Sequence, residues 1–500
     1  MSVTPELPTV LSDQEALQFP DGNELFLQLQ LNICHVVPSD IITDKFQSAL
    51  SKTLANFPHA AGRLKHDEQG WKASIVLTNS PVSIEIVDEH DRDEVLSSNL
   101  RGSVLQKSED LLPFITPVSL EGAVTGQDVP LITFKLTKLS KTGETVIGIS
   151  WNHILGDATT LKLFMTTLSQ YYQDLAPPDA PTFHKRSWPQ PPQGPEGDEL
   201  YKQYAPHVVK SYPMADVIAK YTAEAMSACM VDLTFTKEQQ DRLLVLAQAS
   251  SPRLKEKQRQ SVSSDLTRQD ALSAHLISLQ RRCYNSPVRS VMYMMNYRTQ
   301  TEDTNALWRH PKNAGNCVYL PSFDISSSDT LPDLARAIRQ GVNNARTTEF
   351  LETYLTLNGA AQEGALRTGQ FHIYPAEDVV LINGLAKDNI GRAAHFGFEG
   401  KSQYYTDVSW ERMFRIFPVN PVKKEDGTWE SNEGSTVVAF RVKNELKDRL
   451  FELFEEDMKR IMNGSDIGAD KTTVPTTKTK RGTVVNKMLY VLRVLRSLKL

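Results

Sequence analysis

Residues 150–164 read SWNHILGDATTLKLF, and this stretch joins the end of a strand to the start of a helix. The preceding residues 145–151 (TVIGISW) are mostly apolar and β-branched, which is typical of a strand. After Asp157, apolar side chains recur at helical spacing. His153 lies at the junction of the two elements. The pattern therefore indicates an α/β architecture in which His153, just beyond a strand end, projects into a cleft.

His153 has the properties of a general base. The ordinary pKa of histidine is about 6.5, so the ring is mostly neutral at pH 7 and one nitrogen can accept a proton. Among the 11 histidines, only His153 is followed by an aspartate four residues later. Asp157 could orient the ring or hold the loop, and Gly156 gives the backbone room to turn. From spacing alone two other interpretations stay open: Asp157 as the helix N-cap, and His153 as a half-buried structural histidine.

Length and composition restrict the class of protein. A chain of 500 residues exceeds what one hydrophobic core supports, so two domains are expected. The net charge of −5 argues against a nucleic-acid-binding protein. The 4 cysteines form no CxxC pair, so neither a zinc site nor a disulfide framework is expected. No metal is implied, and no P-loop, GxGxxG, HExxH or GxSxG motif occurs.

The two ends of the chain bear on its location. The N-terminal residues lack the basic start and apolar core of a signal peptide, and no stretch approaches the roughly 20 apolar residues of a membrane span. We therefore expect a soluble, cytoplasmic protein. Residues 466–500 are a basic tail with a short amphipathic helix pattern at 484–500. That helix is interpreted as docked on the protein's own body in preference to a membrane surface.

The order of elements predicts two α/β domains joined by a crossover. Seven prolines between residues 177 and 195 exclude a central strand or helix there. The predicted parts are a first domain at 1–175, a linker at 176–205, a second domain at 206–465 and the tail. Strands are predicted at 25–37, 131–139, 145–151, 229–235, 288–296, 378–384 and 435–442. Helices are predicted at 41–56, from Asp157 onward, 206–228, 236–250, 267–283, 331–347 and 443–462. Met292, Met294 and Met295 are interpreted as strand core.

Several segments, in the same order along the chain, resemble the BAHD family of acyl-CoA-dependent acyltransferases, in its fungal members more than its plant members. The resemblance extends from about residue 25 to 460. Its segments are LSKTLANFPHAAGRL (50–64), SWNHILGDATTLKLF (150–164), the Pro-rich crossover (176–195), TRQDALSAHLISLQRR (267–282) with the strand that ends at Arg298, NAGNCVYLP (313–321) and AAHFGFEGKSQYY (393–405).

Two of these segments depart from the family pattern. Ala158 replaces the usual glycine after the HxxxD motif. The stretch at 393–405 is similar to the DFGWG motif and keeps Phe396, Gly397 and Gly400. It has other residues in place of the aspartate and the tryptophan, and a glutamate before the last glycine. The changes keep open a catalytically silent binding protein of the same fold.

The resemblance implies a fold like that of chloramphenicol acetyltransferase: two similar α/β domains, each a mixed sheet flanked by helices, with a channel at their interface. It implies that His153, in mid-channel, takes the proton from the acceptor hydroxyl or amine. The nucleophile would then attack the acyl-CoA thioester directly, in a ternary complex. Acyl-CoA would be a cosubstrate with no bound cofactor. The acceptor would be a small molecule, such as a secondary metabolite, and the protein a monomer.

The resemblance also implies roles for other residues. Asp157 would point away from the channel and pair with Arg298. Phe396, Gly397 and Gly400 would be scaffold near the CoA end. At the strand end where plant members carry Thr-Ser-Trp, this chain has Asn383, whose side-chain amide is a candidate donor to the oxyanion. A condensation-type relative is a further alternative, but such proteins carry a second histidine where this chain has Asn152.

Overall fold

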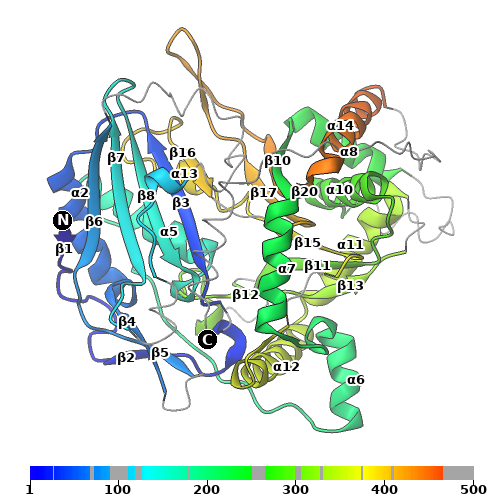
Figure 1. Cartoon of the computed structure of the whole chain (residues 1–500), viewed down its shortest axis with the longest axis horizontal. Coiled ribbons are helices and arrows are strands. Elements are labelled where there is room, and N and C mark those ends of the chain that lie inside the picture. The colour runs from blue at the N-terminus through cyan, green and yellow to red at the C-terminus, as the bar shows by residue number, and fades with distance from the viewer. Residues whose placement is uncertain are drawn as a thin grey trace.

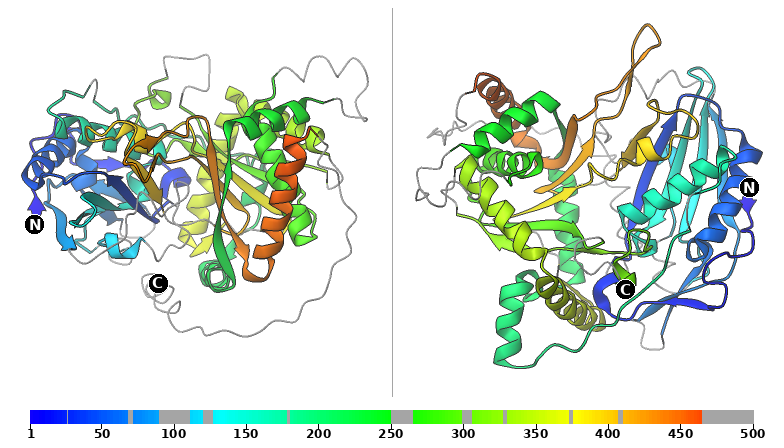
Figure 2. Two further views of the ribbon diagram at one scale, coloured as in Figure 1. Left: turned by 90° about the horizontal axis from the view of Figure 1, so that it is seen from above. Right: turned by 180° about the vertical axis from the view of Figure 1, so that it is seen from behind.

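The computed structural model describes residues 1–25, 27–67, 72–89, 111–119, 127–177, 180–249, 265–298, 306–326, 330–372, 376–406 and 410–464. Over these ranges the chain forms two large mixed sheets, which lie side by side with helices packed on them (Figures 1 and 2). The predicted α/β class with two sheet-based halves is confirmed. The C-terminal tail and its predicted amphipathic helix lie outside the described residues.

The first sheet has the strand order β1-β6-β7-β8-β3-β16. Its strands are β1 (Ser2–Val3), β6 (Val82–Glu89), β7 (Ile132–Leu139), β8 (Glu144–Asn152), β3 (Gln30–Val37) and β16 (Gln403–Thr406). Helices α2 (Thr43–Asn56) and α5 (Ala158–Tyr172) share one hydrophobic core with this sheet. Every residue of β8 is buried, which accounts for its nearly continuous apolar sequence.

The second sheet has the order β10-β20-β17-β15-β11-β12, with β13 also paired to β11. Its strands are β10 (Ala228–Phe235), β20 (Thr436–Lys443), β17 (Met413–Pro418), β15 (Val379–Gly384), β11 (Ser290–Asn296), β12 (Val318–Tyr319) and β13 (Ser322–Asp324). One of its faces packs against α8 (Lys237–Gln248), α10 (Arg268–Tyr284), α11 (Leu331–Ala345) and α14 (Lys447–Met462). The other face is directed toward the first half of the molecule (Figure 1).

The structure corrects one domain boundary. Residues 390–406 were predicted to belong to the second domain, but β16 pairs antiparallel with β3 in the first sheet. Ile390 and Ala394, on and just after α13 (Ile390–Ala393), and Phe396 are part of the first core. An apolar segment satisfies either core equally well, so its sequence pattern does not reveal which one it joins. The second half of the chain therefore completes the first sheet.

Two helical predictions also differ from the structure. The helix predicted at 206–228 is shorter, because the 3-10 turn Pro206–Val208 occupies its start and α7 runs only over Met214–Ser227. A further helix, α6 (Pro195–Tyr204), lies in the segment that was predicted as linker. Pro206 begins the 3-10 turn and Pro213 precedes α7, where the missing N–H costs nothing. The long helix α12 (Thr348–Arg367) was not predicted, because Gly359 and Gly364 lower its helix propensity. A Cβ at Gly359 would lie 2.6 Å from Asn23 Nδ2, so the glycine permits close packing.

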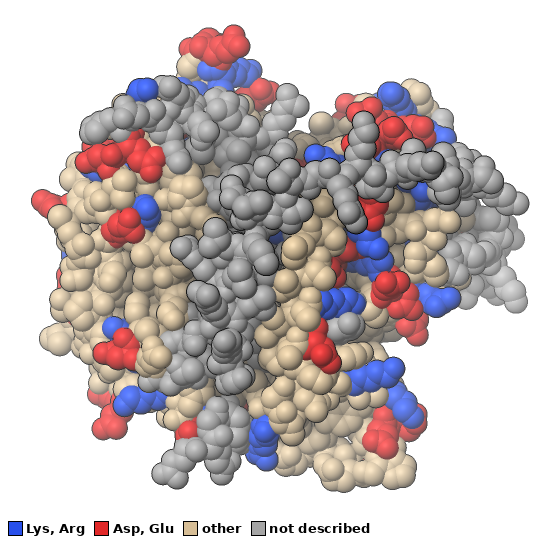
Figure 3. All heavy atoms as spheres, viewed as in Figure 1, with Lys and Arg blue, Asp and Glu red and all other residues tan. Residues whose placement is uncertain are grey.

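The surface and the helices give two further observations. On the face shown in Figure 3, acidic and basic side chains are interspersed over both halves of the molecule. Within the described ranges, no helix is both long and apolar enough to cross a membrane.

Candidate active site

His153 is placed by the end of a buried strand. β8 ends at Asn152, and the side chain of Asn152 accepts a hydrogen bond from the Ile154 amide at 3.0 Å. This bond caps the short 3-10 helix His153–Leu155. The His153 amide donates to the Leu29 carbonyl at 2.7 Å. The backbone at His153 is therefore held both by the Asn152 side chain within the turn and by Leu29, just before the neighbouring strand.

Gly156 makes the turn from this 3-10 helix into α5. Its φ of +146° is rarely adopted by a residue with a side chain. A Cβ at this position would also lie 2.5 Å from the Cβ of Thr160. The Gly156 carbonyl accepts a hydrogen bond from the Trp151 indole at 3.0 Å. A glycine is thus required between His153 and Asp157, as the sequence suggested.

Asp157 has a separate role for each carboxylate oxygen. Oδ1 accepts from the Thr160 amide at 3.0 Å, which makes Asp157 the N-cap of α5. Oδ2 accepts from Arg298 Nη1 at 2.7 Å and from the Cys317 amide at 2.9 Å. Asp157 therefore caps α5 and also pairs with Arg298. Asp157 is only 3% exposed, so these bonds replace water around a buried charge.

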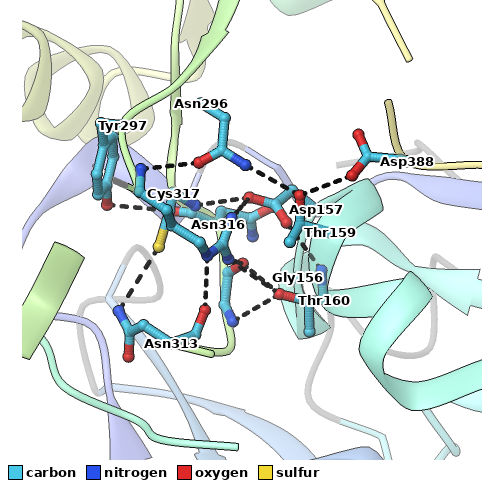
Figure 4. Close-up of polar contacts among 12 residues, drawn as sticks. Gly156, Asp157, Thr159, Thr160, Asn296, Tyr297, Asn313, Asn316, Cys317 and Asp388 are labelled. Carbon is cyan, nitrogen blue, oxygen red and sulfur yellow. Dashed lines mark hydrogen bonds and ion pairs between the residues drawn. The ribbon is translucent and has the colours of Figure 1, made fainter. Parts of the chain in front are cut away.

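Arg298 follows β11 and joins the two halves of the molecule. Its Nε donates to the Asn313 carbonyl at 2.8 Å, and Nη2 donates to the Gly315 carbonyl at 3.0 Å and to Thr160 Oγ1 at 3.2 Å. Figure 4 shows this network around Asp157, Thr160, Asn313 and Cys317. Burial alone would raise the pKa of Asp157, but Arg298 and the amide donors outweigh it and the pKa is lowered. The carboxylate is therefore ionised at neutral pH.

The crossover is also part of the site. Thr182 forms a parallel bridge to Asn313, and the Ala314 amide donates to the Thr182 carbonyl at 2.7 Å. The Asn313 side chain accepts from the His184 amide at 2.8 Å and donates to the His184 carbonyl at 3.0 Å. The segment predicted only as a linker thus holds residues 313–317 against Arg298.

The imidazole of His153 is in a state suited to a base. The side-chain amide of Asn316 donates to the His153 carbonyl at 2.8 Å. Burial lowers the pKa of His153, Asp157 and Asn316 raise it, and the Arg415 cation lowers it again, with a net lowering. The ring is therefore neutral at pH 7, as the sequence suggested. Its buried Nδ1 makes no hydrogen bond to any described residue.

Asn383 and Arg415 lie side by side on the face of the second sheet that is turned toward the first half. They are register partners in β15 and β17. Phe417, two residues after Arg415 and on the same face, contacts Tyr404 of β16. Arg415 lies close enough to His153 to affect its pKa. Asn383 therefore occupies the interface between the halves, and its role as oxyanion donor stays a prediction.

A cavity of about 980 Å³ begins two residues farther back along the same strands. Its wall includes Met292, Leu381 and Met413, which are register partners across β11, β15 and β17. Because a strand rises about 3.3 Å per residue, this wall lies roughly 7 Å from Asn383 and Arg415. Met295 is core, as predicted, whereas Met292 lines the cavity. Side chains alternate between the two faces of a strand, so residues three positions apart lie on opposite faces.

The stretch that resembles DFGWG packs into the first core. Phe396 is 2% exposed and contacts the rings of His35, Phe46 and Tyr172. Its amide donates to Ser169 Oγ at 2.8 Å. Gly397 and Gly400 have φ of +93° and +71°, which explains why glycine occurs at both positions. These contacts are consistent with a scaffold role, and the placement near CoA stays a prediction.

Sequence reasoning missed several residues of this site. They are Glu24, Thr160, Lys185, Gly315, Asn316, Cys317 and Arg415. The only signal was the short GN pair in NAGNCVYLP, which was noted without a role. Most of the others contribute backbone groups or a single charge, and neither produces a recognisable sequence pattern.

Comparisons with known proteins identify the family and the fold. The model of the transferase family matches residues 29–355. No curated protein matches the chain. Among solved structures, the fold is similar to that of F. graminearum TRI101 complexed with coenzyme A and T-2 mycotoxin, with a TM-score of 0.62 at 14% identity, covering 87% of this chain and 97% of that one.

Two other solved structures share the fold. Vinorine synthase has a TM-score of 0.56 at 13% identity, covering 93% of this chain and 97% of its own. The first condensation domain of the CDA synthetase has a TM-score of 0.53 at 10% identity, covering 95% of this chain and 99% of its own. At these identities the likeness shows the fold alone.

Proposed function

This chain belongs to the transferase family of BAHD acyltransferases, and on that premise we propose that it transfers an acyl group from acyl-CoA to a hydroxyl or amine of a small molecule, with His153 as general base. The observation that carries the proposal is the position of His153 at the strand end, where its backbone amide donates to the Leu29 carbonyl and its backbone carbonyl accepts from the Asn316 side chain. Burial lowers the pKa of its imidazole, which favours the neutral ring. Such a base takes the proton as the acceptor attacks the thioester carbonyl.

Asp157 and Arg298 hold the loop and do not touch the reacting atoms in this mechanism. Asn383 is proposed to donate to the oxyanion that develops on the thioester carbonyl. The chemistry calls on no metal and no bound cofactor, because acyl-CoA is consumed as a cosubstrate. The proton leaves on His153 and the thiolate of CoA takes it up as the acyl group is transferred.

Thiol release tests the proposal. A panel of acyl-CoAs would be offered with a mixed pool of alcohols and amines to the wild type and to Asn383→Ala. Acceptor-dependent release of CoA, with the acylated product identified by mass, supports acyl transfer. An unchanged kcat in Asn383→Ala removes this residue as oxyanion donor. Tight binding of pool members without any turnover would instead support the silent binding protein.

The pH dependence of kcat/KM is expected to show an acid limb below pH 6.5. Because the pKa of His153 is lowered from its ordinary value of 6.5, the ring stays deprotonated and active at lower pH than a free histidine would. The measurement is kcat/KM between pH 4.5 and 8 at constant ionic strength. A limb at or above pH 6.5 would contradict this assignment of the base.

We propose that the cavity beside the site receives the acceptor. The charged side chains in its lining are balanced between Lys202, Lys210, Arg412 and Asp324, Glu349, Glu411. A balanced lining suits a neutral acceptor better than the phosphate-bearing CoA. The volume of about 980 Å³ is at the upper end of small-molecule sites.

Filling this cavity should weaken acceptor binding selectively. Leu381→Trp is expected to raise the KM for the acceptor about tenfold, ~1.4 kcal/mol, and to leave the KM for acyl-CoA unchanged. Val245→Trp on the exposed face of α8 is the matched control, since Val245 is 67% exposed. Steady-state kinetics with each substrate varied in turn decides the result. A rise in the KM for acyl-CoA alone would assign the cavity to the donor.

A further inference from the structure

A buried ion pair lies beside the site and outside every motif of the sequence. Glu24 belongs to the short helix α1 (Gly22–Leu25) and is 8% exposed. Lys185 comes from the crossover, and its Nζ lies 2.6 Å from each carboxylate oxygen of Glu24. A charged pair removed from water needs further hydrogen bonds to persist, so its remaining contacts are informative.

Glu24 connects this pair to the base. Its Oε2 also accepts from the Asn316 amide at 2.9 Å. The side chain of Asn316, which is 3% exposed, donates in turn to the His153 carbonyl at 2.8 Å. A continuous chain of bonds therefore leads from Lys185 through Glu24 and Asn316 to the residue that carries the imidazole. Charge-assisted bonds such as those of Glu24 are stronger than neutral ones.

Two carboxylates hold the same peptide segment from two sides. Glu24 accepts from the Asn316 amide, and Asp157 accepts from the next amide, that of Cys317. Gly315 lies directly over the ion pair, because a Cβ at that position would be 2.5 Å from Lys185 Nζ. Its φ of +116° also favours glycine. The segment 315–317 is thus shaped to lie between the ion pair and the Arg298–Asp157 pair.

We propose that Glu24 is a positioning residue for His153, which acts through Asn316 and is held in place by Lys185 of the crossover. The inference rests on the proposed role of His153. A catalytic side chain must be held within about 0.5 Å of its productive position, and a displacement of about 1 Å can cost a hundredfold in rate. By this link the crossover sets the position of the base as well as joining the two halves.

A double-mutant cycle tests the link. In Glu24→Gln the side-chain amide has only one oxygen to accept from two donors, the Lys185 ammonium and the Asn316 backbone N–H. Its NH₂ group would then face one of these two donors. In Asn316→Ala the backbone amide remains, but the bond to the His153 carbonyl is lost. Each single variant is expected to lower kcat about 10- to 100-fold with the KM for acyl-CoA unchanged.

The double variant Glu24→Gln/Asn316→Ala should be no slower than Asn316→Ala, because both changes break one chain of contacts. Losses in kcat that multiply in the double variant would overturn the proposal. So would a rise in the KM for acyl-CoA with no change in kcat, because that result would place Glu24 in substrate binding.

A matched control separates positioning from general stability. Asp457 and Arg282 form another buried ion pair, between α14 and α10 in the second core. These helices pack on the sheet face that is turned away from the first half (Figure 1). Asp457→Asn should lower the melting temperature at least as much as Glu24→Gln but leave kcat at the wild-type level. An equal loss of kcat in Asp457→Asn would show that instability alone explains the Glu24 result.

A readout without turnover distinguishes this inference from the proposed function. In protein with isotope-labelled histidine, the ring signal of His153 is identified by its loss in His153→Ala. That signal should move in Glu24→Gln and in Asn316→Ala and stay unchanged in Asp457→Asn. If it moves although no acyl transfer is detected, the link stands and the proposed function fails. A signal that stays in place in both variants overturns the link.

Discussion

Replacing His153 with alanine is expected to lower kcat by about 10²- to 10⁴-fold, which is the range that general bases contribute. Without the imidazole, no group takes the proton from the acceptor as it attacks the thioester. The bonds that fix the backbone of residue 153 are made by its own amide and carbonyl, so the alanine variant should keep the fold. Acceptor-dependent release of CoA, measured with each substrate at saturation, gives the result.

A second histidine serves as the control for this prediction. His66 is a partly buried residue of β4 (Arg63–His66), on the small three-stranded sheet, and His66→Ala should leave kcat within about twofold of the wild type. The KM for acyl-CoA should change little in His153→Ala, because the base acts on the acceptor. A His153→Ala variant that retains more than about a tenth of the wild-type kcat would rule out His153 as the base.

Replacing Arg298 with methionine is expected to reduce the free energy of unfolding by about 3–5 kcal/mol, the usual cost of leaving a buried charge without its partner. Asp157 would lose its strongest donor, and the carbonyls of Asn313 and Gly315 would each lose one. Denaturant unfolding at pH 7 measures the loss. Because Arg298 binds the segment that contacts His153, kcat should fall as well.

The loss of stability in Arg298→Met should depend on pH. The pKa of Asp157 is lowered in the folded protein, so its stabilisation is present above its unfolded pKa of about 3.9 and is lost as pH falls through the lowered value. In Arg298→Met the pKa of Asp157 should rise instead. The difference in stability between the two proteins should therefore shrink as the pH is lowered from 7 toward 4.

Arg289 is the matched control for Arg298. It comes just before β11, its side chain is 66% exposed, and its nitrogen lies 3.7 Å from Asp378. Surface ion pairs contribute little, so Arg289→Met should change the unfolding free energy by no more than about 0.5 kcal/mol. A loss of less than about 1 kcal/mol in Arg298→Met would mean that the buried pair does not stabilise the fold.

Part of the site could be predicted because its chemistry is local. His153, Gly156 and Asp157 follow one another along five residues, and the turn that joins strand to helix needs each of them. Arg298 was predicted only through the family resemblance, which places an arginine at the end of a predicted strand. Glu24 and Lys185 were not, since an isolated acid and an isolated base 161 residues apart have no pattern in common.

The fold likewise has parts that follow from local sequence and parts that depend on contacts between distant segments. Most strands and helices of both sheets follow from the period of their apolar residues, because burial of one face is a local requirement. The assignment of β16 to the first sheet does not. Tyr405 is buried there against a strand more than 350 residues earlier, yet its own segment reads like any short strand.

The sequence by itself determined the class of fold, the strand–turn–helix that carries His153, and the pairing expected between Asp157 and Arg298. These follow from backbone geometry and side-chain chemistry within short segments, or from a family pattern carried by such segments. Only the tertiary structure decided which core residues 390–406 join and where the cavity lies. It also decided which charges surround the segment 315–317, because burial and electrostatic contacts depend on distances between parts of the chain that no local pattern relates.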